Sequence, residues 1–384
     1  AKCGRSGPAQ IRTAVTATLG ASSADLGFGD KTMARPNQSL TPTTPEEALD
    51  LYLRERSTDV ADSTLQAHEY RLSHFVRWCE GVEDIDNTND LTGRSLHHYK
   101  LWRKEDGDLN KVSLKSQMDT LRVFLRFCES IDAVVPDLHS KVMSPTLSNG
   151  VGQRDVKLDS EEAEDVLDYL ERFEYASFAH VLVLLLWRTG IRTGSARALD
   201  VSDYNSEDEC LAIRHRPETD TPLKNKENGE RLVALSPATH AVLTDWVKHR
   251  RPDVTDEHGR VPMLATENGR ASKNTVRETV YKWTRPCQYL GECPHGRDMD
   301  DCEALAVRWG ASKCPSSVSP HAVRRGSITH HLTEDVPEKV VSDRMNVSQR
   351  VLEEHYDRRS EEVKWSRGEG ILMTYSSPSR YSVH

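Results

Sequence analysis

The chain has 384 residues, and 60 acidic against 51 basic side chains give it a net charge of −9. Hydrophobic residues make up 36% of the sequence and charged residues 29%, which is enough apolar material for packed cores and excludes a wholly disordered chain. No apolar run approaches the about 20 residues of a membrane-spanning helix, and no signal sequence opens the chain. We therefore expect a cytoplasmic protein of two domains with no membrane partner.

The first part of the chain is predicted to form a small all-α domain. Residues 1–43 are rich in Ala, Thr, Ser and Gly without periodicity, and we expect a disordered leader there. A capping pattern at residues 44–47 predicts the first helix start, because Thr precedes Pro at the first helical position and Glu follows. The helical spacing of apolar residues predicts three more helices, so four short helices occupy residues 44–140.

A group of basic residues lies in the second half of this domain. Its members are Arg94, Lys100, Arg103, Lys104, Lys111, Lys115, Arg122 and Arg126. The acidic residues among them are Glu105, Asp106, Asp108 and Asp119, which leaves a local excess of 8 − 4 = +4. One interpretation is a solvated helix face. The other is contact with the phosphates of double-stranded DNA.

A linker and a second domain are predicted for the rest of the chain. Residues 141–158 form the expected linker, because Pro, Gly and Ser cluster there without periodicity. The second domain is expected over residues 159–365, followed by a flexible tail at 366–384. Helical patterns occur near 160–173, 177–189, 237–249, 272–284, 321–332, 337–345 and 351–356. Strands are expected at 210–215 and 231–235 around a turn at 227–230. The predicted fold class is α+β, mostly α, with one small antiparallel sheet.

Four separated pieces of the second domain contain residues suited to phosphodiester chemistry. Arg192 follows Thr-Gly-Ile at a turn between helices, and Lys226 lies in the predicted hairpin. His321-Ala-Val-Arg324 opens a helix after Pro, and Tyr356 ends the pattern. The order Arg, Lys, His-x-x-Arg, Tyr over this span resembles the tyrosine recombinase (phage integrase) family, and the four-helix domain resembles that family's core-binding domain.

The resemblance implies that these residues cut and rejoin DNA. Arg192 and Arg324 would hold the non-bridging phosphate oxygens, because a guanidinium can donate two parallel hydrogen bonds to them. Tyr356 would be the nucleophile that forms a 3′-phosphotyrosyl link. Since this link stores the energy of the DNA bond, resealing needs no nucleotide and catalysis needs no cofactor.

Two further groups would assist by moving protons. By resemblance to the family, a hairpin lysine protonates the leaving 5′-oxygen. Counting back from Arg231 by the family's usual spacing favours Lys226, with Lys224 as the alternative in the same loop. His321 would accept a proton or donate a hydrogen bond to the phosphate.

The chain departs from the family at one position. The family usually carries Gly-His, sometimes with Trp in place of His, nine residues before the tyrosine. Here the pair is Asn346 and Val347, and valine has no hydrogen-bonding side chain. Arg344 and His355 are alternative donors. The surrounding sequence looks like integrases of halophilic archaea, in agreement with the acidic composition.

Soft metal donors are concentrated in residues 285–316, just ahead of His321. They are Cys287, Cys293, His295, Cys302 and Cys314. Without a secretory signal, such a cluster indicates a metal site before it indicates disulfides. Four cysteines, or three with the histidine, suit tetrahedral zinc. Tight turns are expected around the donors at Gly291, Pro294, Gly296 and Pro315, whereas apolar residues are few. We expect a structural zinc site, with a loop of free thiols as the alternative.

The favoured function is site-specific recombination of DNA, in which the protein integrates or excises a mobile element. As in the family, it would act as a homo-tetramer on paired DNA sites. One alternative is a type IB topoisomerase, which uses the same nucleophile chemistry, but the preceding four-helix domain favours the recombinase. Another is a catalytically inactive DNA-binding repressor on this fold, for which the missing Gly-His pair is the support.

Overall fold

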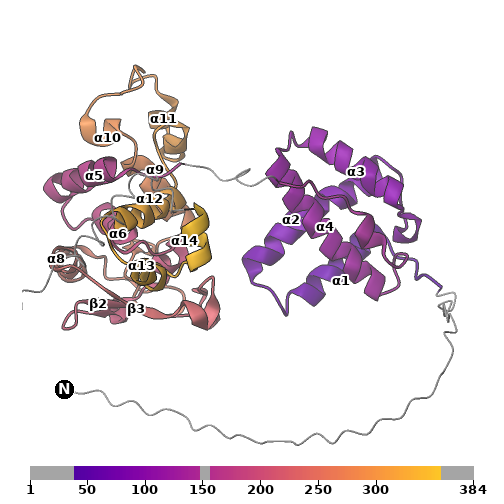
Figure 1. Cartoon of the computed structure of the whole chain (residues 1–384), viewed down its shortest axis with the longest axis horizontal. Coiled ribbons are helices and arrows are strands. Elements are labelled where there is room, and N and C mark those ends of the chain that lie inside the picture. Colours follow the sequence, from indigo (N-terminus) through magenta and orange to yellow (C-terminus); the bar gives the residue numbers. More distant parts are fainter. Residues whose placement is uncertain (1–38, 148–155, 356–384) are drawn as a thin grey trace, which may run out of the picture. The chain divides into compact units, whose positions relative to one another are not determined.

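The computed structural model describes residues 39–147 and 156–355 and divides into two compact units, with the boundary between Gln153 and Arg154 (Figure 1). The predicted leader up to residue 38, the predicted tail and Tyr356 lie outside the described residues. None of the helices in the described ranges is long and apolar enough to cross a membrane.

The first unit is a bundle of four helices. It contains α1 (Pro45–Arg56), α2 (Asp62–Gly81), α3 (Gly93–Asp106) and α4 (Lys111–Ser130), with short 3-10 turns η1 (Thr88–Asp90) and η2 (Leu138–Lys141). Stacked and edge-on rings fill its core, since Phe75, Trp78 and Tyr99 are at most 1% exposed and their ring centroids lie 5.1 to 6.0 Å apart. The predicted all-α domain is therefore present over the described residues.

Side-chain caps begin three of these helices. The Thr44 hydroxyl accepts the Glu47 N–H (3.1 Å) ahead of α1. Thr92 and Ser95 form a reciprocal capping box at α3. The Asn110 side chain accepts the Ser113 N–H (2.9 Å) at α4. These bonds satisfy N–H groups that lack a partner within the helix, which is why helices start at these residues.

The second unit is mostly helical with two small antiparallel sheets. Its helices are α5 (Ser160–Phe173), α6 (Phe178–Thr189), α7 (Thr193–Ala198), α8 (Pro237–Asp245), α9 (Lys273–Trp283), α10 (Cys287–Leu290), α11 (Glu303–Ala306), α12 (Pro320–Thr333), α13 (Glu338–Met345) and α14 (Gln349–His355). Shorter turns are η3 (Val201–Asp203), η4 (Pro217–Thr219), η5 (Lys226–Gly229), the π-helical η6 (Trp246–Arg250) and η7 (Arg308–Lys313). The fold class is α+β and mostly α, as predicted.

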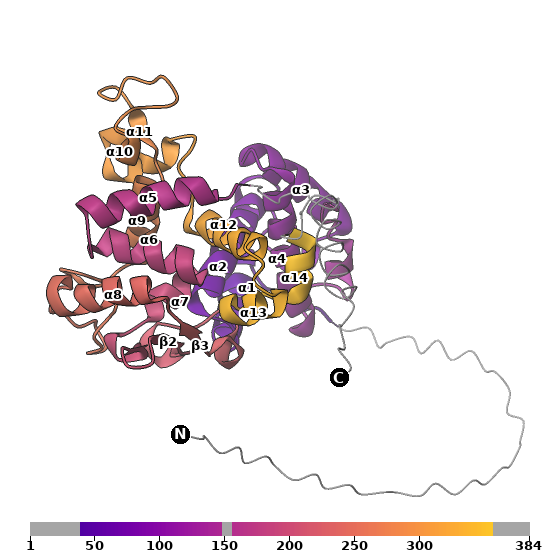
Figure 2. The ribbon, with the colours of Figure 1, turned by 60° about the vertical axis from the view of Figure 1, so that its left-hand side comes forward.

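Helix α6 is the centre of this unit. All residues from Val181 to Trp187 are buried, so this helix is apolar on every face and requires neighbours around it. Helices α5, α8, α9 and α12 provide them, and α12 lies beside α6 in both views (Figures 1 and 2). The close approach depends on Gly326, because a Cβ built there would lie 2.9 Å from the Trp187 ring of α6 and 2.0 Å from the Leu158 carbonyl oxygen ahead of α5.

The sheets differ in part from the prediction. Strands β1 (Tyr204–Asn205), β2 (Cys210–Ile213) and β3 (Arg231–Ala234) form one antiparallel sheet, with Cys210 opposite Ala234. A second pair, β4 (Ala265–Thr266) and β5 (Gly269–Arg270), was not predicted, because two-residue strands show no alternation. The expected turn at 227–230 is part of a longer loop, residues 214–230, that contains η4 and η5.

Candidate active site

The first predicted catalytic segment lies where α6 ends. Gly190 terminates α6 with a left-handed φ of 58°, which glycine adopts without strain, and a Cβ there would lie 2.5 Å from the Met345 sulfur. Ile191 is then fully buried, which anchors the turn. Arg192 follows as the half-buried N-cap residue of α7.

The second predicted catalytic segment is the start of α12. Ser319 caps this helix and Pro320 occupies its first turn, so His321 and Arg324 are on its first two turns. His321 is exposed, whereas Arg324 is 4% exposed and donates to the Gly190 carbonyl. This bond joins the start of α12 to the turn that carries the first arginine.

The third predicted catalytic segment is the loop before β3. Lys224 and Lys226 are both exposed there. Lys226 has a left-handed φ of 51°, and its N–H donates to the Leu223 carbonyl (3.1 Å). Leu223 is 5% exposed, and its own N–H donates to His215 Nδ1 (2.9 Å). The loop is therefore anchored just ahead of its two lysines.

The electrostatics of His321 show that these segments meet. Its pKa is lowered first by partial desolvation and then by the charges of neighbouring cations. Those cations are Arg325, Arg324, Lys224 and Arg192. The structure thus brings together predicted residues from the α7 start, the lysine loop and α12. A neutral imidazole in a cationic cluster can accept a proton at neutral pH.

Arg231 adds another cation, which is not part of the predicted catalytic set. Its pKa is lowered to about 10, first by burial and then by Arg192 and Arg344. Among the described residues, the basic side chains that these shifts place around the site are Arg192, Lys224, Arg231, His321, Arg324, Arg325 and Arg344. A concentration of positive charge is suited to a phosphate group.

Helix α13 explains the departure from Gly-His. Asn346 ends α13 with a φ of 50°, the left-handed conformation that glycine would provide. Val347 is 8% exposed and packs with Ile328, Leu332 and Leu352. The valine is thus a core residue of the α12–α14 cluster, and its backbone still follows a helix-ending turn.

The alternative donors have different positions. Arg344 donates to the carbonyls of Ala234 (2.7 Å) and Arg188 (3.2 Å), so it holds the end of α6 against β3. His355 is the last residue of α14, and its side chain is outside the described part of the structure, as is Tyr356.

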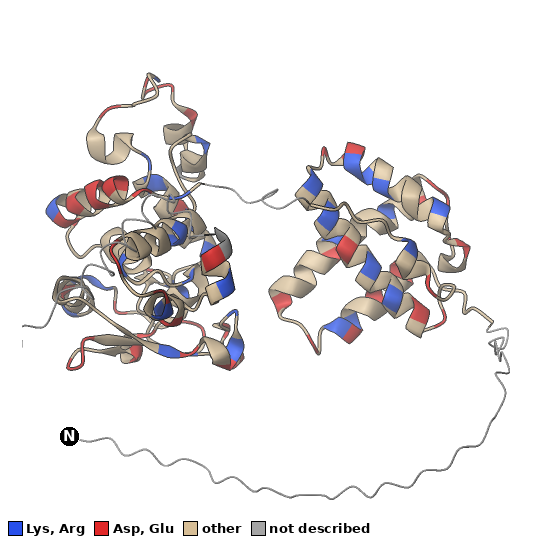
Figure 3. Ribbon diagram, in the orientation of Figure 1, with Lys and Arg blue, Asp and Glu red and all other residues tan. Residues whose placement is uncertain are grey.

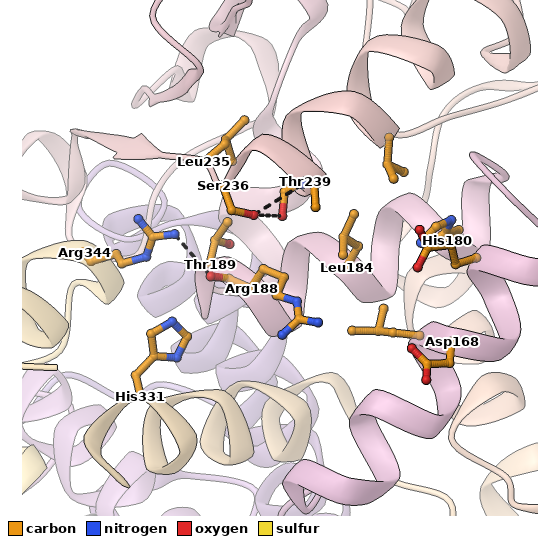
Figure 4. Close-up of a pocket in the computed structure, with 14 residues that line it drawn as sticks. Asp168, His180, Leu184, Arg188, Thr189, Leu235, Ser236, Thr239, His331 and Arg344 are labelled. Carbon is orange, nitrogen blue, oxygen red and sulfur yellow. Dashed lines mark hydrogen bonds between the residues drawn. The ribbon is translucent and has the colours of Figure 1, made fainter. Parts of the chain in front are cut away.

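A cavity of about 370 Å³ borders the cluster through Arg344 (Figure 4). Arg188, Thr189, Ser236 and His331 also line it. Figure 4 shows the bond from the Arg344 guanidinium to Arg188 at its edge. The other predicted catalytic residues that the structure describes are not among its lining, so this cavity is adjacent to the site and separate from it.

The basic residues of the first unit fall into two groups. Arg94, Lys104, Lys111 and Arg126 are exposed. Lys100 is half-buried, and Lys115 and Arg122 form ion pairs with Asp119 at 2.6 and 3.1 Å. Figure 3 shows basic positions along α3 and α4, interspersed with acidic ones.

Arg103 requires a correction. Its side chain is 4% exposed and bound to Gln117 (2.8 Å) and Asp106 (3.2 Å). It belongs to the core of the bundle and has no access to DNA, because its buried guanidinium already has fixed partners.

The cysteine donors lie around α10, α11 and η7. Cys287 starts α10, Cys302 precedes α11 and Cys314 follows η7. The pKa of Cys287 is raised by burial and by the thiols of Cys314, Cys293 and Cys302, and lowered by Arg285. Each of the other three thiols is therefore near enough to Cys287 to affect its charge.

In the described part of the chain, no three of these sulfur atoms lie within 4.8 Å of one another. Among the described residues, ligand atoms of three or more donors approach within 4.8 Å of one another at Asp220, Glu257 and His258, an exposed group elsewhere. His295 is exposed and bound to Ser316 (3.1 Å).

Comparisons with known proteins agree with this architecture. The model of the phage integrase family matches residues 157–361, which contain every predicted catalytic position. An integrase of the transposon Tn1549, solved with a circular intermediate DNA, is 13% identical with a TM-score of 0.61, and the match covers 85% of this chain and 99% of that one. A lambda integrase dimer on a core site is 13% identical with a TM-score of 0.54, covering 89% and 81%.

A third similar structure is the N-terminal domain of a phage integrase/site-specific recombinase from Haloarcula marismortui. It is 39% identical with a TM-score of 0.26, and the match covers 27% of this chain and 99% of that one. No curated protein sequence matches the chain.

Proposed function

The chain belongs to the phage integrase family, and on that premise we propose that it is a site-specific DNA recombinase acting through Tyr356. The observation that carries this proposal is the cationic cluster around Arg192, His321 and Arg324, which is assembled from three distant segments. Such a cluster stabilises the charge of a five-coordinate phosphorus and of a tyrosinate.

The proposed cleavage step conserves every atom and electron pair. The Tyr356 oxygen attacks phosphorus, the bond from phosphorus to the 5′-oxygen breaks, and a 3′-phosphotyrosine forms. The tyrosine proton passes to His321, whose lowered pKa keeps it neutral. Lys226, or Lys224 beside it, gives a proton to the departing 5′-oxygen. Attack by a 5′-hydroxyl of another strand reverses these steps and joins new ends.

The first unit would contribute contacts to the DNA backbone. Arg94, Lys104, Lys111 and Arg126 are exposed and can release counterions on binding phosphates. We infer a homo-tetramer on two paired sites, because exchange between two duplexes requires four cleavages. We also infer integration or excision of a mobile element and a cytoplasmic location. Each of these is a proposal based on family membership.

A trapped covalent intermediate would test the proposal. Wild type and Tyr356→Phe are incubated with a nicked suicide substrate made from the element's junction sequence, in high salt. Tyr70→Phe is the matched control, because Tyr70 is 65% exposed and lies in the other unit. We expect a denaturation-resistant protein–DNA adduct with wild type and Tyr70→Phe, and none with Tyr356→Phe.

The other outcomes separate the alternatives. An adduct on any DNA sequence, together with relaxation of supercoils, would favour a type IB topoisomerase. Intact binding without an adduct from wild type would favour an inactive DNA-binding protein on this fold. The absence of the Gly-His pair is the observation behind that second alternative.

We also propose a structural zinc ion bound by Cys287, Cys293, Cys302 and Cys314, with exposed His295 as a fifth candidate donor. The support is the proximity of the other three thiols to Cys287 and the small core of this insertion. Within residues 287–314, the buried hydrophobic residues are Ala304, Ala311 and Cys314, whereas Leu290 and Trp309 are 53% and 71% exposed. A segment with so little apolar burial needs another source of stability.

Metal analysis of the purified protein tests this proposal. We expect about one zinc per chain in wild type and loss of zinc in Cys302→Ser, together with faster proteolysis of the insertion. Cys210→Ser is the matched control, since Cys210 is also half-buried and lies outside the insertion. A wild-type protein without zinc, or equal zinc in both variants, would contradict the assignment.

A further inference from the structure

The loop that carries the two lysines is bound to the end of α13 at both of its sides. Arg231, the first residue of β3, provides the first side. Its Nε donates to the Arg344 carbonyl (2.7 Å) and its Nη1 to the Gly229 carbonyl (2.7 Å). One guanidinium thus connects the loop to the last turn of α13, a geometry that the single amine of lysine cannot reproduce.

Asn346 provides the second side. Its Oδ1 accepts a hydrogen bond from Asn225 Nδ2 (2.9 Å), the residue immediately before Lys226. A Cβ built on Gly229 would lie 3.1 Å from Asn346 Nδ2, so the loop backbone lies directly against this side chain. Figures 1 and 2 both show α13 next to β3. A glycine at position 346 would keep the helix end and lose these contacts.

Lys226 lies between the two attachments. Asn225 precedes it, Gly229 follows it by three residues, and Lys226 itself has a φ of 51°. Fixing a loop residue costs about 1–2 kcal/mol of backbone entropy. Because these bonds fix the backbone before DNA is bound, the amine needs less ordering to reach the 5′-oxygen.

We propose that Arg231, Asn225 and Asn346 form a latch that positions Lys226 as the general acid, so that this chain uses the Gly-His position to hold the lysine loop. The inference rests on the proposed recombinase function. The three are positioning residues, since they act through the lysine. The latch also connects the loop to α13, which leads through α14 to the nucleophile.

The first test compares two leaving groups. Single-turnover cleavage is measured on ordinary DNA and on DNA with a 5′-bridging sulfur, a leaving group that needs no proton. We expect Asn346→Gly and Asn225→Ala to cleave ordinary DNA at least about tenfold more slowly, which is less than the about 10²–10⁴-fold expected when a general acid is lost completely. The sulfur substrate should restore both variants to the wild-type rate, and DNA affinity should not change.

Asn228→Ala is the matched control, because Asn228 is an exposed residue of the same loop. Arg231→Lys is a second test of the latch and should behave like the asparagine variants. Wild-type rates in all latch variants would overturn the proposal. Equal slowing on both substrates would also overturn it, because a general structural defect is not repaired by the leaving group.

Lys226→Ala and Tyr356→Phe separate this result from the proposed function. An adduct with wild type and rescue of Lys226→Ala by sulfur establish tyrosine cleavage with a lysine acid, whatever the latch does. If wild type forms no adduct on either substrate, the proposed function fails. If Lys226→Ala is not rescued, the latch has no general acid to position and the inference fails alone.

Discussion

Replacing Gly326 by alanine tests whether the close packing of α12 holds the catalytic site together. Gly326 is an interior residue of α12, and alanine there would gain about 1 kcal/mol of helix propensity. The structure predicts the opposite sign. A Cβ at this position would lie 2.0 Å from the Leu158 carbonyl oxygen and 2.9 Å from the Trp187 ring.

The size of the effect follows from these distances. A carbon and a carbonyl oxygen normally stay about 3.3 Å apart, so the two backbones must separate by roughly 1.3 Å. Overpacking of this kind costs about 1–3 kcal/mol. The separation would also weaken the bond from the Leu158 N–H to the Ala322 carbonyl (3.3 Å), at about 1 kcal/mol. After subtraction of the propensity gain, we expect a net loss of about 1–3 kcal/mol.

Urea unfolding of the full chain, followed by tryptophan fluorescence, measures this loss as a lower transition midpoint. Gly194→Ala is the matched control, because Gly194 lies in α7 and a Cβ there meets nothing within 4 Å. It should be neutral or stabilising by up to about 1 kcal/mol. A Gly326→Ala protein as stable as wild type would refute the argument that α12 is held at this distance by a missing Cβ.

Three further predictions concern pH, the basic residues and salt. Burial lowers the pKa of His180 to about 4 from 6.5, and its ring accepts the Ala176 N–H (3.2 Å). As pH falls, the unfolded chain binds a proton at His180 before the folded chain does. The free energy of unfolding, measured in urea titrations, should therefore drop by about 3 kcal/mol between pH 6.5 and 4. The His180→Asn variant should show a weaker dependence of this free energy on pH. Arg103→Ala should destabilise the first unit by about 1–3 kcal/mol in such titrations. Lys104→Ala should leave stability unchanged, and it should reduce by about 1 the slope of log DNA affinity against log salt concentration. Since acidic side chains exceed basic ones by nine, unfolding midpoints should rise with KCl concentration, and a falling midpoint would contradict this.

Elements with a long repeating pattern of apolar residues could be predicted best from the sequence. In helices of ten or more residues, apolar side chains recur every three or four positions often enough to define both the type and the range of the element, as α5 at Ser160–Phe173 illustrates. The ends of the expected linker were harder, because Val142 and Leu158 pack into the cores of the first and second unit. A single apolar residue beside Pro, Gly and Ser gives no pattern, and tertiary packing decides its place.

The catalytic site was predictable as a set of residues and unpredictable as a set of contacts. Motif spacing selected Arg192, His321 and Arg324, and the structure assembles them. Spacing could not reveal that Arg231 would join the same cluster, because its position depends on one carbonyl of α13, that of Arg344, which lies more than a hundred residues away in the sequence. Backbone acceptors leave no signal in the side-chain sequence.

The cluster itself gives a reason for the low pKa values found there. Burial is the first cause of the lowered pKa values of His321 and Arg231, and neighbouring cations that repel one another lower both pKa values further. A bound phosphate offsets this repulsion and raises the pKa of His321. Under the mechanism proposed above, the imidazole is neutral in the free protein, and its proton affinity rises beside the phosphate as the tyrosine gives up its proton. The protonated ring would return that proton when a 5′-hydroxyl attacks the phosphotyrosine. The cations that lower the pKa of His321 in the empty site would therefore allow it to act as proton acceptor in cleavage and as proton donor in rejoining.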